Sequence, residues 1–135
     1  MGVFADTWFY VAFIDARDLN HEIVQRYADS LTTVQVTTRW VLAELANFAS
    51  VGSGRSVVAG LIRQLENHSH VRIIGESDGL FHRGLALYER RPDKEWSLTD
   101  CISFVVMEDE GIREALTNDH HFTQAGYVAV FADAS

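Results

Sequence analysis

The 135-residue sequence predicts an α/β fold with a mainly parallel sheet. Short segments rich in apolar and β-branched residues alternate with longer segments of helical periodicity from one end of the chain to the other. This alternation is typical of parallel strands joined by crossover helices. A chain of this length is most simply one domain, residues 1–135, and is large enough to enclose one hydrophobic core. The sequence contains no repeat, low-complexity tract or linker.

Five short segments predict the strands. Each consists mostly of apolar or β-branched residues and is separated from the next segment by helical or turn-forming sequence, as expected for strands buried in a parallel sheet. The predicted strands are residues 3–5, 34–37, 71–74, 115–117 and 128–131. The first strand leads directly into a helical segment, which places Asp6 at the junction between them.

Six longer segments have the apolar spacing of helices that pack against a sheet. They are residues 7–14, 21–30, 39–50, 56–67, 80–90 and 98–110. Thr38, Ser97 and either Ser77 or Asp78 are placed to act as N-caps. Gly111 can end the last helix in a left-handed conformation. The residues predicted to face inward are Ile23, Val24, Tyr27, Leu31, Val57, Leu61, Ile62 and Leu65.

The composition excludes several classes of protein. Cys101 is the only cysteine, so neither a disulfide framework nor a cysteine-rich zinc site is expected. No apolar run approaches the roughly 20 residues that span a bilayer. The start of the chain lacks the basic region and cleavage site of a signal peptide. These features predict a soluble cytoplasmic protein without a membrane contact.

The net charge of −8 argues against general nucleic-acid binding, because neutralisation of phosphates normally supplies most of that affinity. Bound divalent cations would cancel part of this charge. Of the 11 basic residues, only Lys94 is a lysine. Arginine grips phosphate with two hydrogen bonds in a way that lysine does not, although genomic composition bias is the simpler explanation of the excess.

Four acidic residues lie beside segments that are predicted to be buried. Asp6 follows the first strand directly, and Asp119 follows the fourth strand by one residue. Glu44 interrupts the apolar helix after the second strand, and Asp100 lies in the first turn of the last long helix. Because ligands of an open parallel sheet bind at the carboxyl ends of its strands, the four acids can face one crevice. With no matching set of nearby Lys or Arg, they predict a divalent metal site.

Each acid also has a simpler explanation. Asp6 could cap the helix that it precedes, and Glu44 could face solvent. Asp100 could form a capping box with Ser97, where the helix dipole also favours an acid. Asp119 could be a turn residue. The functional interpretation therefore rests on the four acids together.

Oxygen ligands without cysteine or paired helical histidines favour Mg²⁺ or Mn²⁺ over Zn²⁺. The chemistry expected of such a site is attack of water on a phosphodiester, in which the metal activates the water and offsets charge on the leaving oxygen. We expect Asp6 and Asp100 to be direct ligands. Glu44 and Asp119 are expected to hold a second metal ion, a water, or both.

Two further polar segments accompany the acids. His120 and His121 are adjacent, so in an extended chain only one could face the site; we expect His120 to be exposed and His121 to be packed or hydrogen-bonded rather than a ligand. Arg90, Arg91 and Lys94 lie just before the last long helix. They form either a solvated loop or contacts to a phosphate beside the acids, which makes them candidate RNA contacts.

Four short motifs in order along the chain resemble those of the PIN domain, and most of all those of VapC-type toxins of bacterial toxin–antitoxin pairs. The motifs are Phe4-Ala5-Asp6-Thr7, Thr38 to Glu44, Ser97 to Asp100 with Ile102 to Met107, and Leu116 to Phe122 with Gly126-Tyr127. Each motif is weak alone, but the four in this order and spacing are specific, and they cover nearly the whole chain.

The resemblance implies a three-layer α/β/α sandwich with a five-stranded sheet and an endoribonuclease that depends on Mg²⁺ or Mn²⁺. It assigns the family's acids to Asp6, Glu44, Asp100 and Asp119. It also assigns supporting hydroxyl groups to Thr7 and Ser97. The partners that it implies are an RNA substrate, a second copy of the chain in a homodimer, and an antitoxin that inserts a C-terminal segment.

Other metal-dependent families fit less well. A DEDD-type exonuclease needs a Glu, and a haloacid-dehalogenase phosphatase an Asp, two residues after the first acid, where this chain has Trp8. A receiver domain needs a Lys after its last strand, and Lys94 precedes a helix. The main alternative is a PIN-like module that binds RNA or a protein without cutting. The complete set of four acids argues against it.

Overall fold

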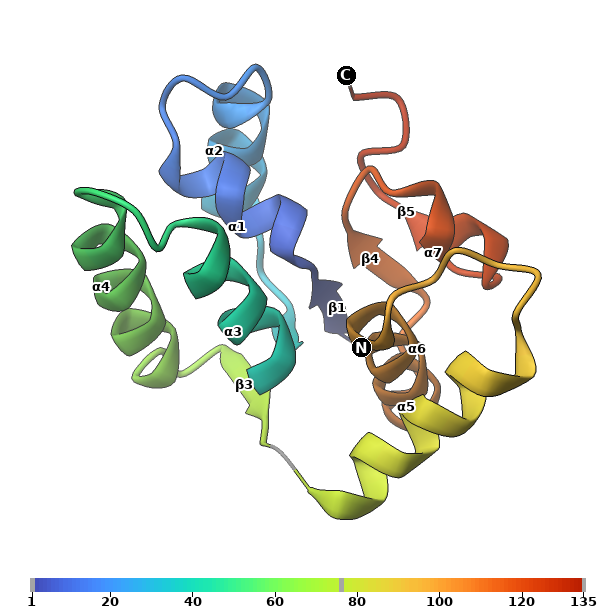
Figure 1. Ribbon diagram of the computed structural model, residues 1–135. Coiled ribbons are helices and arrows are strands. Elements are labelled where there is room, and N and C mark those ends of the chain that lie inside the picture. The colour runs from blue at the N-terminus through green and yellow to red at the C-terminus, as the bar shows by residue number, and fades with distance from the viewer. Residues whose placement is uncertain (1, 76, 135) are drawn as a thin grey trace.

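A computed structural model describes residues 2–75 and 77–134 and contains the predicted five-stranded parallel sheet. The strands are β1 (Gly2–Ala5), β2 (Val34–Thr38), β3 (Val71–Ile74), β4 (Glu114–Leu116) and β5 (Val128–Ala129). Their order across the sheet is β3-β2-β1-β4-β5. The chain first builds outward from β1 to β3 and then crosses back to add β4 beside β1 (Figure 1). The carboxyl ends of β1 and β4 therefore form the switch point at which such sheets bind ligands.

Helices cover both faces of the sheet and complete a three-layer α/β/α sandwich. They are α1 (Thr7–Ile14), α2 (His21–Ser30), α3 (Arg39–Phe48), α4 (Gly54–Glu66), α5 (Asp78–Arg90), α6 (Leu98–Glu110) and α7 (His120–Gln124). Figure 1 shows α3 and α4 on one side of the molecule and α5 and α6 on the other. Within residues 2–75 and 77–134, no helix is long and apolar enough to cross a membrane.

The predicted capping residues begin and end the helices. Thr38 Oγ1 accepts from Val41 N at 3.1 Å at the start of α3, and Ser77 rather than Asp78 caps α5. Gly111 ends α6 with φ of 69°, a left-handed conformation that favours glycine. These local signals were readable from the sequence because each depends on one short side chain or on the lack of one.

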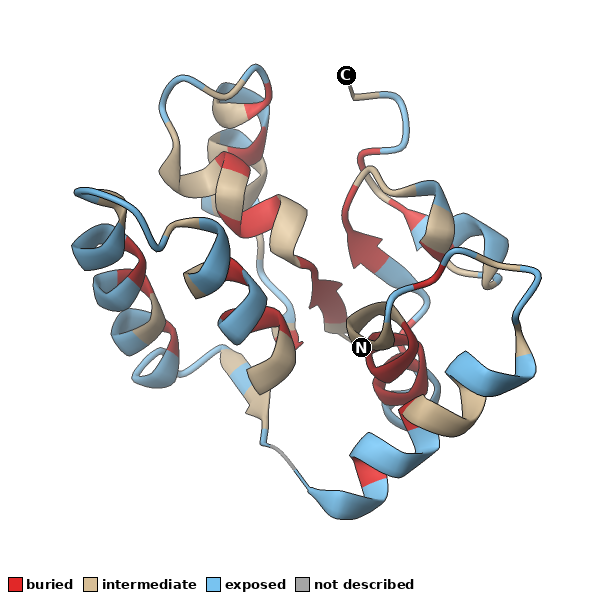
Figure 2. Cartoon of the chain, viewed as in Figure 1, coloured by how far each residue is buried: buried red, intermediate tan, exposed pale blue. Residues whose placement is uncertain are grey.

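The centre of the core is α6, whose residues 101–107 are all buried (Figure 2). Gly84 of α5 lies against Ile102 of α6, and a Cβ atom at Gly84 would come within 2.4 Å of Ile102 Cγ1 and 3.3 Å of its backbone. The absence of a side chain at Gly84 thus allows α5 to pack closely along α6. This packing sets the position of the segment that joins the two helices.

The structure corrects several expectations about the helices. Helix α4 begins at Gly54, two residues earlier than predicted. It buries Leu61 and Leu65 as predicted, but Val58 is buried in place of Val57, which is 51% exposed. Ile23, predicted to face inward, is 44% exposed. Apolar residues at neighbouring positions cannot all face the core of a helix with 3.6 residues per turn, and the sequence pattern did not decide between them. Residues 130 and 131 lie outside β5.

We predict that Gly84→Ala destabilises the protein by about 1–3 kcal/mol, because the new methyl group overpacks the contact between α5 and α6. Gly60→Ala is the matched control, since Gly60 lies within α4 with nothing within 4 Å of an added Cβ. It should stabilise by about 0.5–1 kcal/mol through helix propensity. Urea unfolding followed by circular dichroism measures both changes. Equal effects of the two substitutions would contradict the proposed close packing.

Candidate active site

Asp6 extends the central strand by one residue and reaches its neighbour in register. Because β1 pairs Ala5 with Leu116 of β4, the next residues along the two strands are Asp6 and Thr117. Thr117 Oγ1 donates to Asp6 Oδ2 at 3.0 Å. Asp6 is only 6% exposed. It occupies the N-cap position of α1, but its side chain makes no capping hydrogen bond, so capping does not explain the acid.

The second acid, Glu44, enters the site from helix α3. Its carboxylate Oε1 accepts a hydrogen bond from Thr7 Oγ1, the hydroxyl that follows Asp6 in sequence. Glu44 is exposed, and so are Asn47 and Phe48 on the same side of the helix. The apolar neighbours of Glu44 in the sequence therefore do not make this face of α3 buried, as had been expected. The Glu44 side chain nevertheless lines the same hollow as the other three acids.

Asp100 occupies the third position of α6, where it completes a capping box. Ser97 Oγ accepts from Asp100 N at 3.0 Å, and Asp100 Oδ2 accepts from Ser97 N at 3.1 Å. The same Oδ2 lies 3.1 Å from His121 Nδ1. The sequence left open whether Asp100 caps the helix or belongs to the site. The structure shows that it does both. The cap orients the carboxylate toward the edge of the sheet.

Asp119 is the N-cap of α7, a short helix that the sequence did not predict. Its Oδ1 accepts from His121 N at 2.9 Å and lies 3.4 Å from His121 Nδ1. The helical turn brings ligand atoms of Asp119, His120 and His121 to within 4.8 Å of one another. The expectation that two adjacent histidines cannot face one site was wrong because the segment is helical rather than extended. His120 is exposed and His121 is hydrogen-bonded, as expected.

The four acids line one hollow of about 480 Å³ at the carboxyl edge of the sheet. Around them lie Thr7, Trp8, Ser97, His120 and His121. In the part of the chain that the structure describes, no Lys or Arg lines this hollow. A chain of contacts links the acids through Thr7, Thr117 and His121, since Thr117 Oγ1 also accepts from Asp119 N at 3.1 Å.

The surroundings make it hard to ionise two of these acids. Burial, together with the negative charge of Asp100, raises the pKa of Asp6 to about 7, against hydrogen bonds from the Thr7 backbone and Thr117. Burial also raises the pKa of Asp100, and the charge of Asp119 adds to this, while the contact with His121 lowers it. Burial without full compensation by positive charge therefore makes both carboxylates harder to ionise.

A family model of the PIN domain matches residues 3–126. The chain belongs to the PIN-domain family. Its relatives include the 23S rRNA-specific endonuclease VapC20 of Mycobacterium tuberculosis, which is 31% identical over 129 residues, 95% of this chain and 97% of VapC20. The sequence-based resemblance to VapC-type PIN domains is confirmed.

Solved structures agree with this assignment. The crystal structure of M. tuberculosis VapC20, a sarcin–ricin loop cleaving toxin, superposes with a TM-score of 0.85 at 28% identity and covers 95% of this chain and 98% of that one. FitAcB from Neisseria gonorrhoeae gives a TM-score of 0.65 at 18% identity, covering 96% of this chain and 95% of the other. The second likeness concerns the fold alone.

The donor set of this PIN domain fits a hard divalent cation. Its acids offer carboxylate oxygens, the ligands preferred by Mg²⁺ and Mn²⁺. Asp6 is a buried carboxylate that only neutral groups contact through hydrogen bonds, so a cation would supply the missing positive charge. His120 and His121 add imidazole nitrogens, which are ligands of transition metals rather than of Mg²⁺.

Sequence reasoning overlooked Thr117 and underrated His121. Thr117 was predicted only as the last residue of the fourth strand, yet its hydroxyl joins Asp6 to the Asp119 backbone. The signal available was the strand pairing itself, which aligns Thr117 with Asp6 once β1 and β4 are neighbours. For His121, the N-cap preference of Asp119 could have indicated the short helix.

We predict that the metal-free protein loses stability as pH rises through about 7, and that Asp6→Asn removes this loss. The pKa of Asp6 rises from 3.8 to about 7 on folding. Its stabilising contribution is therefore complete below pH 3.8 and is lost as pH approaches and passes 7. The advantage of the variant over wild type should grow by about 2 kcal/mol between pH 5 and pH 8.

Chemical denaturation in EDTA at a series of pH values measures this difference. Asp133→Asn, at an exposed position near the C-terminus, is the matched control and should follow wild type. If the free energies of unfolding of Asp6→Asn and wild type stay parallel from pH 5 to pH 8, ionisation of Asp6 does not destabilise the folded protein and the prediction is wrong.

Proposed function

We propose that this protein is a metal-dependent endoribonuclease, the toxin of a VapC-type toxin–antitoxin pair, with residues 1–135 acting as one PIN domain in the cytoplasm. The observation that carries the proposal is the single hollow lined by Asp6, Glu44, Asp100 and Asp119, with no Lys or Arg among the described residues that line it. Similarity to the endonuclease VapC20 over 95% of the chain supports the RNA endonuclease class.

Asp6 and Asp100 are the proposed direct ligands of Mg²⁺ or Mn²⁺, since they are the two least exposed acids of the site with raised pKa values. Glu44 and Asp119 would hold a second ion or a water. A bound ion supplies a Lewis acid that activates water and offsets charge on the leaving oxygen. Thr7 positions Glu44, and Ser97 orients Asp100 through the capping box.

The proposed substrate is a structured RNA of the ribosomal type, because VapC20 is a 23S rRNA-specific endonuclease and a sarcin–ricin loop cleaving toxin. The candidate RNA contacts Arg90, Arg91 and Lys94 lie at the end of α5 and in the segment before Ser97. This segment borders the acidic hollow through Glu95 and Ser97, which supports a contact between its positive charges and an RNA strand at the acids.

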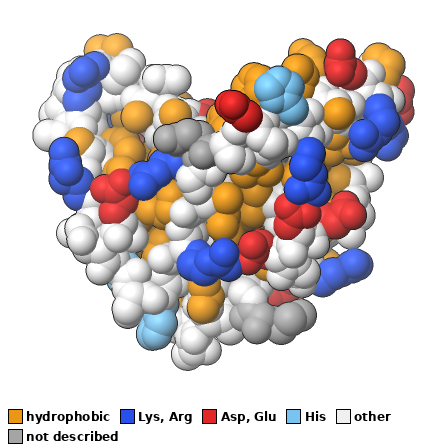
Figure 3. All heavy atoms as spheres, turned by 90° about the horizontal axis from the view of Figure 1, so that it is seen from below, with side chains coloured by type: hydrophobic (Ala, Val, Ile, Leu, Met, Phe, Trp, Pro, Cys, Tyr) orange, Lys and Arg blue, Asp and Glu red, His pale blue; other side chains and the backbone are white. Residues whose placement is uncertain are grey.

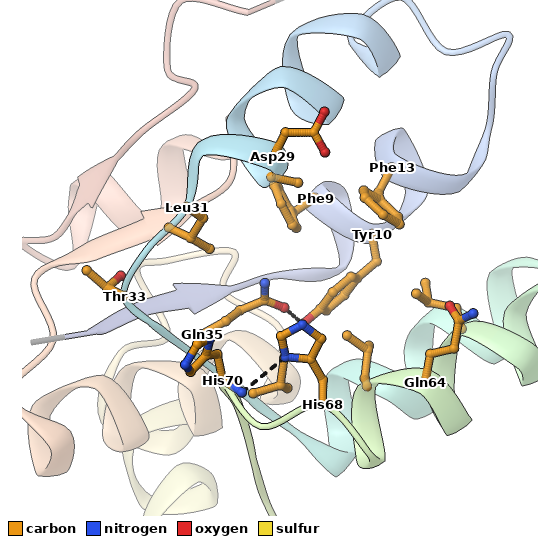
Figure 4. Close-up of a pocket in the computed structure, with 14 residues that line it drawn as sticks. Phe9, Tyr10, Phe13, Asp29, Leu31, Thr33, Gln35, Gln64, His68 and His70 are labelled. Atoms are coloured by element: carbon orange, nitrogen blue, oxygen red, sulfur yellow. Dashed lines mark hydrogen bonds between the residues drawn. The ribbon is translucent and has the colours of Figure 1, made fainter.

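An antitoxin is proposed to hold the protein as a homodimer and to cover the acids with its tail. An apolar hollow of about 270 Å³ between α1, α2 and α4 supports docking of an amphipathic segment. Figure 4 shows Phe9 and Phe13 on one side and Gln64 and His68 on another. Helix α4 contributes Leu61, Gln64 and Leu65 to this hollow.

The homodimer is supported by exposed apolar side chains near the junction of α3 and α4. Phe48 is 68% exposed, Val51 88% and Val57 51%. Large exposed apolar groups that gather at one place mark contact surfaces more often than isolated ones do.

We predict that wild-type protein cleaves a sarcin–ricin loop oligonucleotide in Mg²⁺ or Mn²⁺ and that EDTA abolishes the cleavage. Asp6→Asn and Asp100→Asn should each lower kcat by about 100-fold or more, because each removes charge where the ion and the transition state need it. Asp133→Asn is the control, and a melting curve shows that each variant is folded. Binding of RNA without cleavage in either metal would favour the non-cutting PIN-like module instead.

We also predict that an Arg-bearing antitoxin tail inhibits by competing with the metal. Arginine pairs with carboxylates through two hydrogen bonds, so it can replace the cation among the four acids. A candidate tail peptide and its Arg→Ala variant are added to the cleavage assay at several Mn²⁺ concentrations. The Arg peptide should inhibit about 10-fold more strongly, and less as Mn²⁺ rises. Equal inhibition by both peptides, independent of Mn²⁺, would disprove this mechanism.

A further inference from the structure

A second hollow of about 410 Å³ lies between α5, α6 and α7 and shares no lining residue with the acidic hollow. Its wall combines guanidinium groups with aromatic rings. The residues concerned are Arg83, Arg90, Arg91, Trp96, Phe104 and Tyr127. Trp96 and Phe104 are only 6% and 3% exposed, so the planes open to a ligand are the guanidinium groups, on which unpaired bases stack and which also bind phosphate. The chemistry of this wall therefore suits a nucleotide.

The segment between α5 and α6 separates the two hollows and borders both. Glu95 and Ser97 line the acidic hollow, whereas Trp96 lines the second one. Successive side chains of an extended segment point to opposite sides, which explains the alternation. Helix α7 also borders both, through His121 and Gln124. These residues are three positions apart, about 4.5 Å along the helix axis, so the nucleotide next to one bound at the acids can reach the second hollow.

The stacking surface is organised by contacts within the protein. Trp96 Nε1 donates to Gln124 Oε1 at 3.0 Å, and its ring meets Phe104 edge-on with centroids 5.1 Å apart. The Arg91 guanidinium lies over the Trp96 ring, 5.1 Å from its centroid. Asp93 holds this guanidinium through two hydrogen bonds of 3.0 Å. Arg91 is therefore a flat, oriented platform rather than a freely moving charge.

Arg90 supplies the positive charge that is open to a phosphate. Arg83 makes two hydrogen bonds to Asp109, of 2.6 and 2.8 Å. Arg90 is exposed in the last turn of α5, and no ion pair engages it within residues 2–75 and 77–134. Glu108 lines the hollow on the α6 side, where it repels a phosphate and can accept an N–H group of a base edge. The charges thus place phosphate at Arg90 and base toward Glu108.

We propose that this hollow is a subsite for the nucleotide that flanks the scissile phosphate, with its phosphate on Arg90 and its base stacked on the outer face of the Arg91 guanidinium, which Trp96 supports from behind. The subsite rests on the proposed ribonuclease function. A local site is needed because the net charge is −8. On the face shown in Figure 3, basic side chains are interspersed with acidic ones instead of forming one basic surface. An acidic peptide fits less well, since it would meet Glu108 and would not use the stacking plane.

The test is steady-state cleavage of the sarcin–ricin loop oligonucleotide by wild type, Arg90→Gln, Arg91→Lys and the control Arg63→Gln. Arg63 is an exposed arginine of α4, away from both hollows. Arg90→Gln should raise KM by about 10-fold with little change in kcat, and lower the slope of log(kcat/KM) against log salt by about 1. Arg91→Lys keeps the charge and loses the plane, so KM should rise by about 5-fold with the salt slope unchanged.

The outcomes separate this subsite from the function on which it rests. If wild type cleaves RNA in a metal-dependent way but Arg90→Gln and Arg91→Lys both match Arg63→Gln, the subsite is refuted and the ribonuclease assignment stands. If wild type neither cleaves nor binds the oligonucleotide, the proposed function itself fails. If Arg90→Gln leaves KM for RNA unchanged but weakens inhibition by an acidic peptide, the hollow is a protein-docking site and the nucleotide proposal is overturned.

Discussion

The burial of one carboxylate, that of Asp6, is the constraint on which the site depends. The central strand β1 ends in the core, and the register with β4 places Asp6 against Thr117 rather than in water. Such a group is costly to ionise, as the pKa of about 7 expresses. The backbone of Thr7 at the start of α1 and the hydroxyl of Thr117 relieve this cost only in part, because α6 brings the like charge of Asp100 nearby. A proton or a cation on Asp6 would remove the rest of the cost.

Neutral hydroxyl groups, not basic side chains, orient the acids. Thr7 donates to Glu44, Thr117 donates to Asp6, and Ser97 forms the capping box with Asp100. A hydroxyl donor can set the direction of a carboxylate without cancelling its charge, whereas an arginine in the same place would form an ion pair and occupy the ligand position. None of the chain's ten arginines lines this hollow in the part of the chain that the structure describes, which is consistent with orientation by hydroxyl groups.

The fold and the four acids could be predicted because each depends on a local pattern. Strand–helix alternation gave the sheet, and short capping residues gave the starts of α3, α5 and α6. The contacts of Thr117 and His121 could not be predicted in the same way, since they depend on which strands become neighbours and on a five-residue helix. The outward position of Val57 likewise follows from packing that apolar periodicity does not resolve.

Half of the protein's ten arginines form ion pairs with acids, and this limits how it can attract a polyanion. Arg39, Arg72 and Arg83 each pair with an acid on a different helix or strand from their own. These pairs join separate elements, and they also cancel the positive charge of the arginines at long range. A net charge of −8 then opposes approach of RNA at distances beyond about one Debye length. Attraction has to come at short range, from arginines whose geometry matches a phosphate or a base. Recognition under these conditions depends on the shape of the RNA near the acids more than on its total charge.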